Sequence, residues 1–134
     1  MLDKLSKYQP IAHTVLRIVA GFLWMPHGAQ KLFGFLSDSP DHAQLFSQMW
    51  FAGVIEFGGG LLIMLGLFTR VAAFIGSGEM ASAFFMAHFP RGFWPLENRG
   101  ELPVLYCFLW LFFFVAGAGS FSLDAMLKKR RIGG

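Results

Sequence analysis

The chain has 134 residues, of which 55% are hydrophobic, 17% are aromatic and only 14% are charged. A water-soluble domain carries about 25% charged residues, so this composition excludes a soluble enzyme and equally a disordered chain. The single cysteine, Cys107, excludes a disulfide scaffold, a CxxC redox pair and an all-thiolate metal site within one chain. The net charge of +3 does not indicate nucleic-acid binding, because basic residues cluster at the C-terminus, at positions 128–131.

Four segments are long and apolar enough to cross a bilayer, which takes about 20 helical residues. They cover residues 10–33, 50–68, 71–89 and 103–119. The first is the least regular, since Arg17, Pro26 and Lys31 interrupt it, but both charged heads can extend toward opposite interfaces. The sequence therefore predicts an all-α membrane protein with one domain over residues 1–134, in which four transmembrane helices form an antiparallel bundle.

Lysine and arginine are unevenly distributed between the two ends of this predicted bundle. Four crossings place both termini on one side, and that side carries eight of these residues against three on the other. By the positive-inside rule, both termini are predicted to be cytoplasmic. The basic tail, residues 128–134, is then a topology determinant that contacts anionic lipid, and no nucleic-acid partner is expected.

Two connections on the outer side have distinct sequences. Ser39-Pro40-Asp41 is typical of a helix start, and apolar residues follow it at 43, 45, 46 and 49, which predicts a short interfacial helix. Residues 90–103, PRGFWPLENRGELP, combine three prolines with charged and aromatic side chains. This second connection is predicted to be a stiff, non-helical lid.

Three ionisable residues, His27, Glu56 and Glu79, are expected at membrane depth. His27 and Glu56 lie about 9 Å below the outer edge, and Glu79 lies about 15 Å below it. A charge near the bilayer centre costs several kcal/mol, so each group needs a partner, a water-filled cavity or a neutral protonation state. We predict these three as catalytic residues that exchange protons with a bound molecule.

Polar residues nearer the outer surface are the predicted ligand-binding set. They are Lys31, His88, Arg91, Asn98, Arg99 and Glu101. Structural alternatives stay open for the carboxylates: Glu56 could pair with Lys31 or His27 to join two helices, and Glu79 could pair with Arg17. The histidines and glutamates lack metal-ligand spacing, so no metal site is predicted.

Five short motifs stand out along the chain. They are HGxxK at 27–31, EFGG at 56–59, LFTR at 67–70, NxGExP at 98–103 and FSLD at 121–124. Together they resemble the DoxX family of small four-helix bacterial membrane proteins. Members of that family are linked with membrane oxidoreductase systems, including a thiosulfate:quinone oxidoreductase subunit and a complex with superoxide dismutase and a sulfurtransferase. The resemblance implies a multi-pass protein of the bacterial inner membrane.

The leading interpretation is a membrane component of a redox system that binds a quinone between helices in the outer half of the membrane. The aromatic run at residues 108–114 is a candidate wall for the ring. Quinone reduction consumes two protons and two electrons, and carboxylates with a histidine could exchange the protons. The electrons would come from a redox protein partner or from substrate, because the chain carries no cysteine pair, haem motif or nucleotide-binding glycine motif.

Two other classes of function stay open. A proton-coupled small-solute transporter would also use intramembrane carboxylates, and with four helices it would require a homo-oligomer. In a non-catalytic assembly or docking subunit, the ionisable residues would only fix helix packing. The sequence leaves the cofactor, and whether the chain is an enzyme, undecided.

Overall fold

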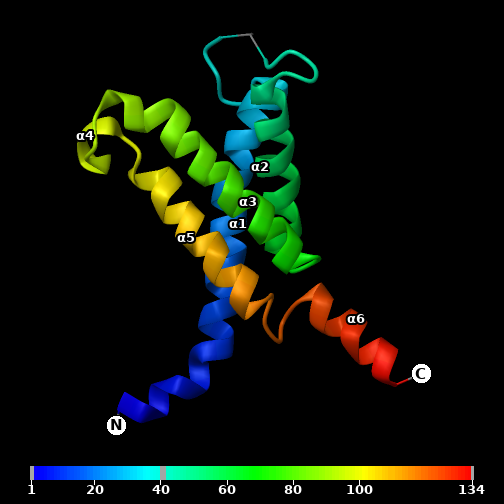
Figure 1. Cartoon of the computed structure of the whole chain (residues 1–134). Coiled ribbons are helices and arrows are strands. Elements are labelled where there is room, and N and C mark those ends of the chain that lie inside the picture. Colours follow the sequence, from blue (N-terminus) through cyan, green and yellow to red (C-terminus); the bar gives the residue numbers. More distant parts are fainter. Residues whose placement is uncertain (1, 40–41, 134) are drawn as a thin grey trace.

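A computed structural model describes residues 2–39 and 42–133, and within these residues every regular element is helical. The long helices are α1 (Gln9–Phe33), α2 (Gln48–Leu65), α3 (Thr69–Ala83) and α5 (Glu101–Ala116). The short ones are η1 (Leu2–Tyr8), η2 (Phe84–His88), η3 (Phe89–Arg91), α4 (Pro95–Asn98) and α6 (Leu123–Ile132). Consecutive long helices run in opposite directions, and both chain ends lie at the same end of the molecule (Figure 1).

Each segment predicted to cross the membrane overlaps one of the long helices. By length and composition together, one helix of the described chain, α2, is sufficient to span a bilayer. Helix α5 is apolar but has 16 residues, and α3 has 15 before it continues as the π-helical turn η2. Helix α1 is the longest, with 25 residues, and it contains the polar residues noted above.

Helices α1 and α2 pack with their backbones close together because glycines lie along the seam between them. A Cβ atom on Gly21 would lie 2.7 Å from the carbonyl oxygen of Gly60. One on Gly28 would lie 2.3 Å from the amide nitrogen of Phe57. Neither position leaves room for a side chain, so the two helices approach as small residues allow. The close packing of α1 against α2 also sets the distance between the polar side chains that these two helices carry.

The core is aromatic and joins the α1–α2 pair to the α3–α5 pair. Trp24 of α1 is fully buried, and its ring centroid lies 4.9 Å from that of Trp110 on α5. The far edge of the indole fits between glycines, because a Cβ on Gly59 or Gly76 would lie 3.0 or 2.6 Å from it. Tyr106 stacks on Trp110 one turn earlier along α5. The indole of Trp24 is therefore held in one orientation by three other helices.

At the end of the molecule that holds both termini, arginines bind the carbonyl groups where α5 ends. Arg17 is buried, and its guanidinium donates hydrogen bonds to the carbonyl oxygens of Ala118 and Phe121. Arg70 donates to the carbonyls of the last turn of α5 in the same way. The predicted alternative of an Arg17 pair with Glu79 is therefore wrong, since the guanidinium is hydrogen-bonded to backbone carbonyls of the α5–α6 connection.

The two connections that were predicted to lie on the outer side differ from their predicted conformations. No helix forms over residues 42–47, and α2 begins after Ser47, whose hydroxyl accepts a hydrogen bond from the amide of Trp50 at 3.2 Å. Pro40 and Asp41, which suggested that helix, lie outside the described residues. The stretch at 90–103 contains the helical turns η3 and α4 and the start of α5. Its prolines occupy first turns, where a helix needs no amide donor, so they start helices here and do not prevent them.

Candidate functional site

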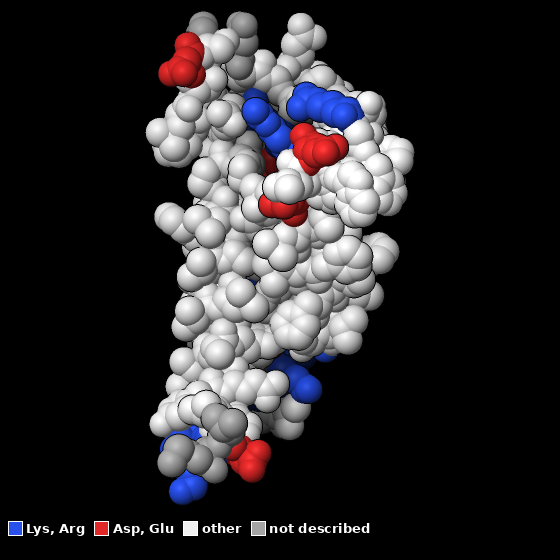
Figure 2. Space-filling model, turned by 90° about the vertical axis from the view of Figure 1, so that its left-hand side faces the viewer, with Lys and Arg blue, Asp and Glu red and all other residues white. Residues whose placement is uncertain are grey.

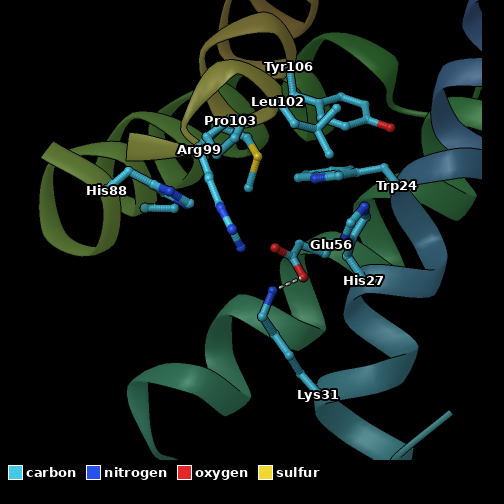
Figure 3. Close-up of a pocket in the computed structure, with 11 residues that line it drawn as sticks. Trp24, His27, Lys31, Glu56, His88, Arg99, Leu102, Pro103 and Tyr106 are labelled. Atoms are coloured by element: carbon cyan, nitrogen blue, oxygen red, sulfur yellow. Dashed lines mark hydrogen bonds and ion pairs between the residues drawn. The ribbon is translucent and has the colours of Figure 1, made fainter. Parts of the chain in front are cut away.

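A cavity of about 290 Å³ lies where α1, α2, the end of η2 and the start of α5 meet. It brings together five of the residues that the sequence singled out: His27, Lys31, Glu56, His88 and Arg99. Figure 3 shows their side chains converging from four different segments of the chain. By burial, His27 and Arg99 are exposed residues, Lys31 and His88 are half-buried, and Glu56 is buried.

Lys31 and Glu56 form an ion pair across the α1–α2 seam. The Nζ atom of Lys31 lies 2.5 Å from Oε2 of Glu56, and the glutamate side chain is only 3% exposed. A carboxylate removed from water in this way needs a partner, and Lys31 provides it. The pairing with Lys31 is one of the two that the sequence left open for Glu56. The second carboxylate oxygen is turned toward the side of the cavity that Arg99 enters (Figure 3).

Asn98 builds the loop above the cavity without lining it. Its buried side-chain amide donates to the carbonyl of Gly92 at 2.8 Å and accepts from the amide of Gly100 at 2.7 Å. Its own carbonyl oxygen lies 3.0 Å from Nδ1 of His88, and because a carbonyl can only accept, Nδ1 carries the proton. A neutral His88 therefore keeps its other ring nitrogen, Nε2, as an acceptor for the cavity that it lines.

Arg99 follows Asn98 and turns its side chain into the cavity. Its backbone has φ of 60° in the left-handed region, where a residue other than glycine is uncommon. The left-handed turn ends α4 and directs the guanidinium toward Glu56 (Figure 3). Strained backbone positions of this kind occur where a side chain must be aimed. Buried Asn98 on one side and buried Gly100 on the other hold this conformation in place.

A second cavity of about 670 Å³ adjoins the first and shares Lys31, Glu56 and His88 with it. Glu79 of α3 lines this second space and not the first. Its Oε2 atom is buried, and no hydrogen-bond donor reaches it from the described residues. Two carboxylates thus face one space, one of them paired with a lysine and the other without a donor at Oε2.

The remaining predicted residues lie apart from both cavities. Arg91 is exposed and lines neither. Glu101 begins α5 and lines a separate depression, which Arg99 and Leu102 also line. The aromatic run at 108–114 contributes Trp110 and Phe113 to the core, and none of its residues lines the first or second cavity. The run therefore packs against other helices and forms no part of the wall of either cavity.

The aromatic and apolar wall of the first cavity comes instead from residues outside the predicted catalytic and ligand-binding sets. They are Trp24, Met80, Ala83, Leu102, Pro103 and Tyr106. Helical spacing could have found part of this wall, because Trp24, His27 and Lys31 recur at i, i+3 and i+7 on one face of α1. On α5, Tyr106 lies four residues after Leu102 and three after Pro103, so each of them is its neighbour on the helix surface. Among the described residues, no group of three or more His, Cys, Asp and Glu side chains could hold a metal ion.

Comparison with known proteins defines the class to which this fold and site belong. An uncharacterized protein of Haemophilus influenzae is 42% identical over 134 residues, which span 96% of this chain and the whole of that protein. The inner membrane protein YqjF of Escherichia coli is 29% identical over 94% of this chain and 99% of its own length. An uncharacterized membrane protein of Mycobacterium tuberculosis is 27% identical over 86% of this chain and 80% of its own. The class is thus that of bacterial membrane proteins.

The particular family follows from a family model. The DoxX model matches residues 12–89, which include most of α1 and the whole of α2 and α3, so the chain belongs to the DoxX family. The resemblance inferred from the motifs is thereby confirmed. No solved structure matches this chain.

Proposed function

We propose that this DoxX-family protein is an integral component of a redox system in the bacterial inner membrane and binds a quinone, or a similar small hydrophobic molecule, between its helices. The observation that carries the proposal is the first cavity, in which an aromatic wall faces Lys31, Glu56, His88 and Arg99. Cavities of about 300 Å³ and more, largely apolar with a few convergent polar groups, are the usual form of small-molecule sites. The glutamates and histidines supply proton exchange, and a partner protein with a redox centre supplies the electrons.

The proposal includes four membrane crossings, by α1, α2, α3 and α5, with both termini in the cytoplasm. Large apolar side chains are exposed along these helices, including Phe22 at 59%, Phe74 at 60% and Phe108 at 64%. A soluble monomer rarely exposes such continuous apolar surface, whereas lipid tails would cover it. Charged side chains gather at the two ends of the face in Figure 2 and leave its broad middle almost without charge, as a bilayer requires.

A route for protons is supported by the way the two cavities share residues. The first cavity holds the ring in this proposal, and the second holds Glu79, whose buried oxygen lacks a donor. Glu56 and His88 line both spaces, so a proton can pass between them without crossing apolar packing. Each reduction of a quinone to a quinol takes up two protons and two electrons, and Glu56, Glu79 and His27 or His88 would deliver the protons.

Purification in native lipid nanodiscs tests the binding proposal directly. We expect mass spectrometry of the lipid extract to find a quinone retained with the wild-type protein and lost from Glu56→Gln. Glu97→Gln is the matched control, because Glu97 is exposed on α4 and lines neither cavity, and it should retain the quinone. Circular dichroism and size-exclusion chromatography report whether each variant is folded.

The alternatives give other results in the same preparation. A folded protein without a small molecule, carrying a soluble partner that persists in Glu56→Gln, would support an assembly or docking subunit. Solute uptake into proteoliposomes driven by a pH gradient would support a transporter. Either result would overturn the proposal.

A further inference from the structure

The first cavity contains a buried hydrogen-bond donor without an acceptor. Trp24 is 0% exposed, and its Nε1 has no hydrogen-bond partner among the described residues, although the indole lines the cavity. The ring cannot rotate to find a partner, because Gly59 and Gly76 hold its opposite edge. A buried donor without an acceptor costs about 1–3 kcal/mol of free energy, and an acceptor atom placed in the cavity would remove this cost. In Figure 3 the indole extends from α1 into the middle of the cluster.

The charges of the lining leave one positive charge in excess. Two cations, Lys31 and Arg99, and one carboxylate, Glu56, face the first cavity, while Glu79 lines only the second. Lys31 already occupies Oε2 of Glu56. No hydrogen bond or ion pair joins the Arg99 guanidinium to any part of the described chain, and it points inward. Arg99 is an exposed residue that still lines the cavity, and a guanidinium without a partner forms charge-assisted hydrogen bonds to an anionic oxygen.

The walls favour a flat, apolar body over an alkyl chain. The rings of Trp24 and Tyr106 lie 6.2 Å apart and are inclined by 32°, and Leu102 and Pro103 cover the side toward the loop. Planar rings pack well against such aromatic faces. The volume of about 290 Å³ is small for a drug-sized ligand, so it suits one ring system and its substituents.

We infer that the first cavity selects a flat, apolar ring that bears one anionic oxygen, held by Nε1 of Trp24 and the guanidinium of Arg99. This inference rests on the proposed binding of a quinone-like molecule and specifies its charge, which the proposal leaves open. Nε2 of His88 is then free to accept a hydrogen bond from a neutral hydroxyl on the same ring. Trp24 and Arg99 are binding residues in this arrangement, and Glu56 keeps Lys31 as its partner.

A matched pair of probes tests the inference. The first is 2-hydroxy-1,4-naphthoquinone, which is anionic at neutral pH, and the second is 2-methoxy-1,4-naphthoquinone, which has the same ring system and no charge. Binding to the full chain in phosphatidylcholine nanodiscs is measured by equilibrium dialysis, with empty nanodiscs subtracted. We expect the hydroxy compound to bind about tenfold more tightly or better, as charge-assisted hydrogen bonds do over neutral ones.

Variants then attribute the preference to the named side chains. Arg99→Gln should reduce the preference to about one, because it removes the charge that has no partner. Arg91→Gln is the matched control: it removes the same charge from the same connection but outside both cavities, and it should keep the preference. Trp24→Phe should weaken binding of both probes, because it removes the Nε1 donor. It should keep the preference for the hydroxy compound, because Arg99 is still present.

Each remaining outcome has a definite meaning. Equal binding of the two probes would overturn the inference and leave the quinone proposal standing, whereas failure of both to bind would overturn the proposal as well. The dialysis is repeated in nanodiscs that contain phosphatidylglycerol, whose headgroup also carries an anionic oxygen. Displacement of the hydroxy compound by this lipid would show that a headgroup takes the anion position, and the assignment of a ring would be wrong.

Discussion

The carboxylate of Asp124 accepts a hydrogen bond from the backbone amide of Thr69, at 3.0 Å, and so caps α3 from a point 55 residues later in the chain. Its other oxygen accepts from the amide of Phe68 at 2.8 Å, and the amide of Asp124 donates to the carbonyl of Gly66. These bonds use donors that every helix leaves unpaired at its start. The LFTR and FSLD motifs are therefore two halves of one structural joint that fixes α6 to the α2–α3 turn.

Removing this cap should destabilise the protein without affecting the cavities. We expect Asp124→Ala to lower the free energy of unfolding by about 1–2 kcal/mol, the range for loss of a helix cap with a favourable charge. Asp38→Ala is the matched control, because Asp38 is exposed in the connection before α2. Thermal unfolding in detergent, followed by circular dichroism, measures both variants. Equal midpoints would show that the joint adds nothing to stability.

The glycine seam between α1 and α2 predicts a sharp contrast between two single-methyl substitutions. Gly28→Ala would place its Cβ 2.3 Å from the amide nitrogen of Phe57 and 2.5 Å from the carbonyl of Gly53, so backbones must separate. We expect a loss of several kcal/mol, because rigid backbone and not a flexible side chain is in the way. Gly58→Ala meets nothing within 4 Å and should be neutral or slightly stabilising, since alanine favours a helix. Expression level and thermal midpoint, compared for the two variants, check the difference.

The sequence predicted the helices well because apolar length and helix-end signals are local. It also placed Lys31 near Glu56, since both were assigned the same end of neighbouring segments. It did not reveal Trp24 as part of the site. Helical spacing places Trp24 on the same face of α1 as His27 and Lys31, but it does not show that this core residue also meets Tyr106 of α5 in the cavity wall.

The outer loop shows why the remaining errors arose. Three prolines in residues 90–103 favoured a non-helical stretch, but a proline at the start of a turn is compatible with a helix, and sequence alone does not give its position in the turn. Arg91 and Arg99 could not be distinguished either, because sequence alone does not give the direction of a side chain in a turn. Both arginines are exposed residues, but the left-handed backbone at Arg99, fixed by the hydrogen bonds of Asn98, directs its side chain to the first cavity, which Arg91 does not line.

Cysteine labelling tests the proposed crossing of the membrane. In a Cys107→Ala background, Leu96→Cys on α4 and Ile132→Cys on α6 place single thiols at positions that are 79% and 77% exposed. An impermeant maleimide should label position 96 in intact spheroplasts and position 132 only after lysis, because the basic end is retained in the cytoplasm. Labelling of both after lysis is the control. Labelling at 132 in intact spheroplasts would reverse the orientation.

Asn98 should stabilise the connection at residues 92–100 and not the long helices. Asn98→Ala leaves the half-buried carbonyl of Gly92 without its side-chain donor, which costs about 1–3 kcal/mol, and leaves the amide of Gly100 only its hydrogen bond to the carbonyl of Pro95. Hydrogen exchange should therefore rise over residues 92–100 and stay unchanged in α2. Asn98→Asp keeps the acceptor for Gly100 but buries a carboxylate against the carbonyl oxygen of Gly92, so its effect should be at least as large as that of Asn98→Ala. Glu97→Gln, one residue earlier and exposed, is the control. Uniform exchange throughout the chain would mean that the loop does not open separately.

The Lys31–Glu56 pair allows structural and ligand-binding roles to be separated in one set of variants. Lys31→Met leaves a carboxylate that is 3% exposed without its partner, and we expect a loss of about 3–5 kcal/mol in the free energy of unfolding. Glu56→Gln should cost less, because Lys31 is 26% exposed and can turn toward water. The double variant should be more stable than Lys31→Met alone, since no buried charge remains.

The double variant Lys31→Met with Glu56→Gln then decides between the two roles. If the pair only joins α1 to α2, the folded double variant should retain any molecule that co-purifies with the wild type. If Glu56 also exchanges protons with a ligand, the double variant should be folded, with the circular dichroism spectrum of the wild type. It should then fail either to bind that molecule or to support its reduction. Unfolding in graded denaturant gives the coupling between the two positions, and mass spectrometry of the same preparation gives the occupancy. A folded double variant that binds and reduces the co-purifying molecule as the wild type does would show that both residues serve only in helix packing.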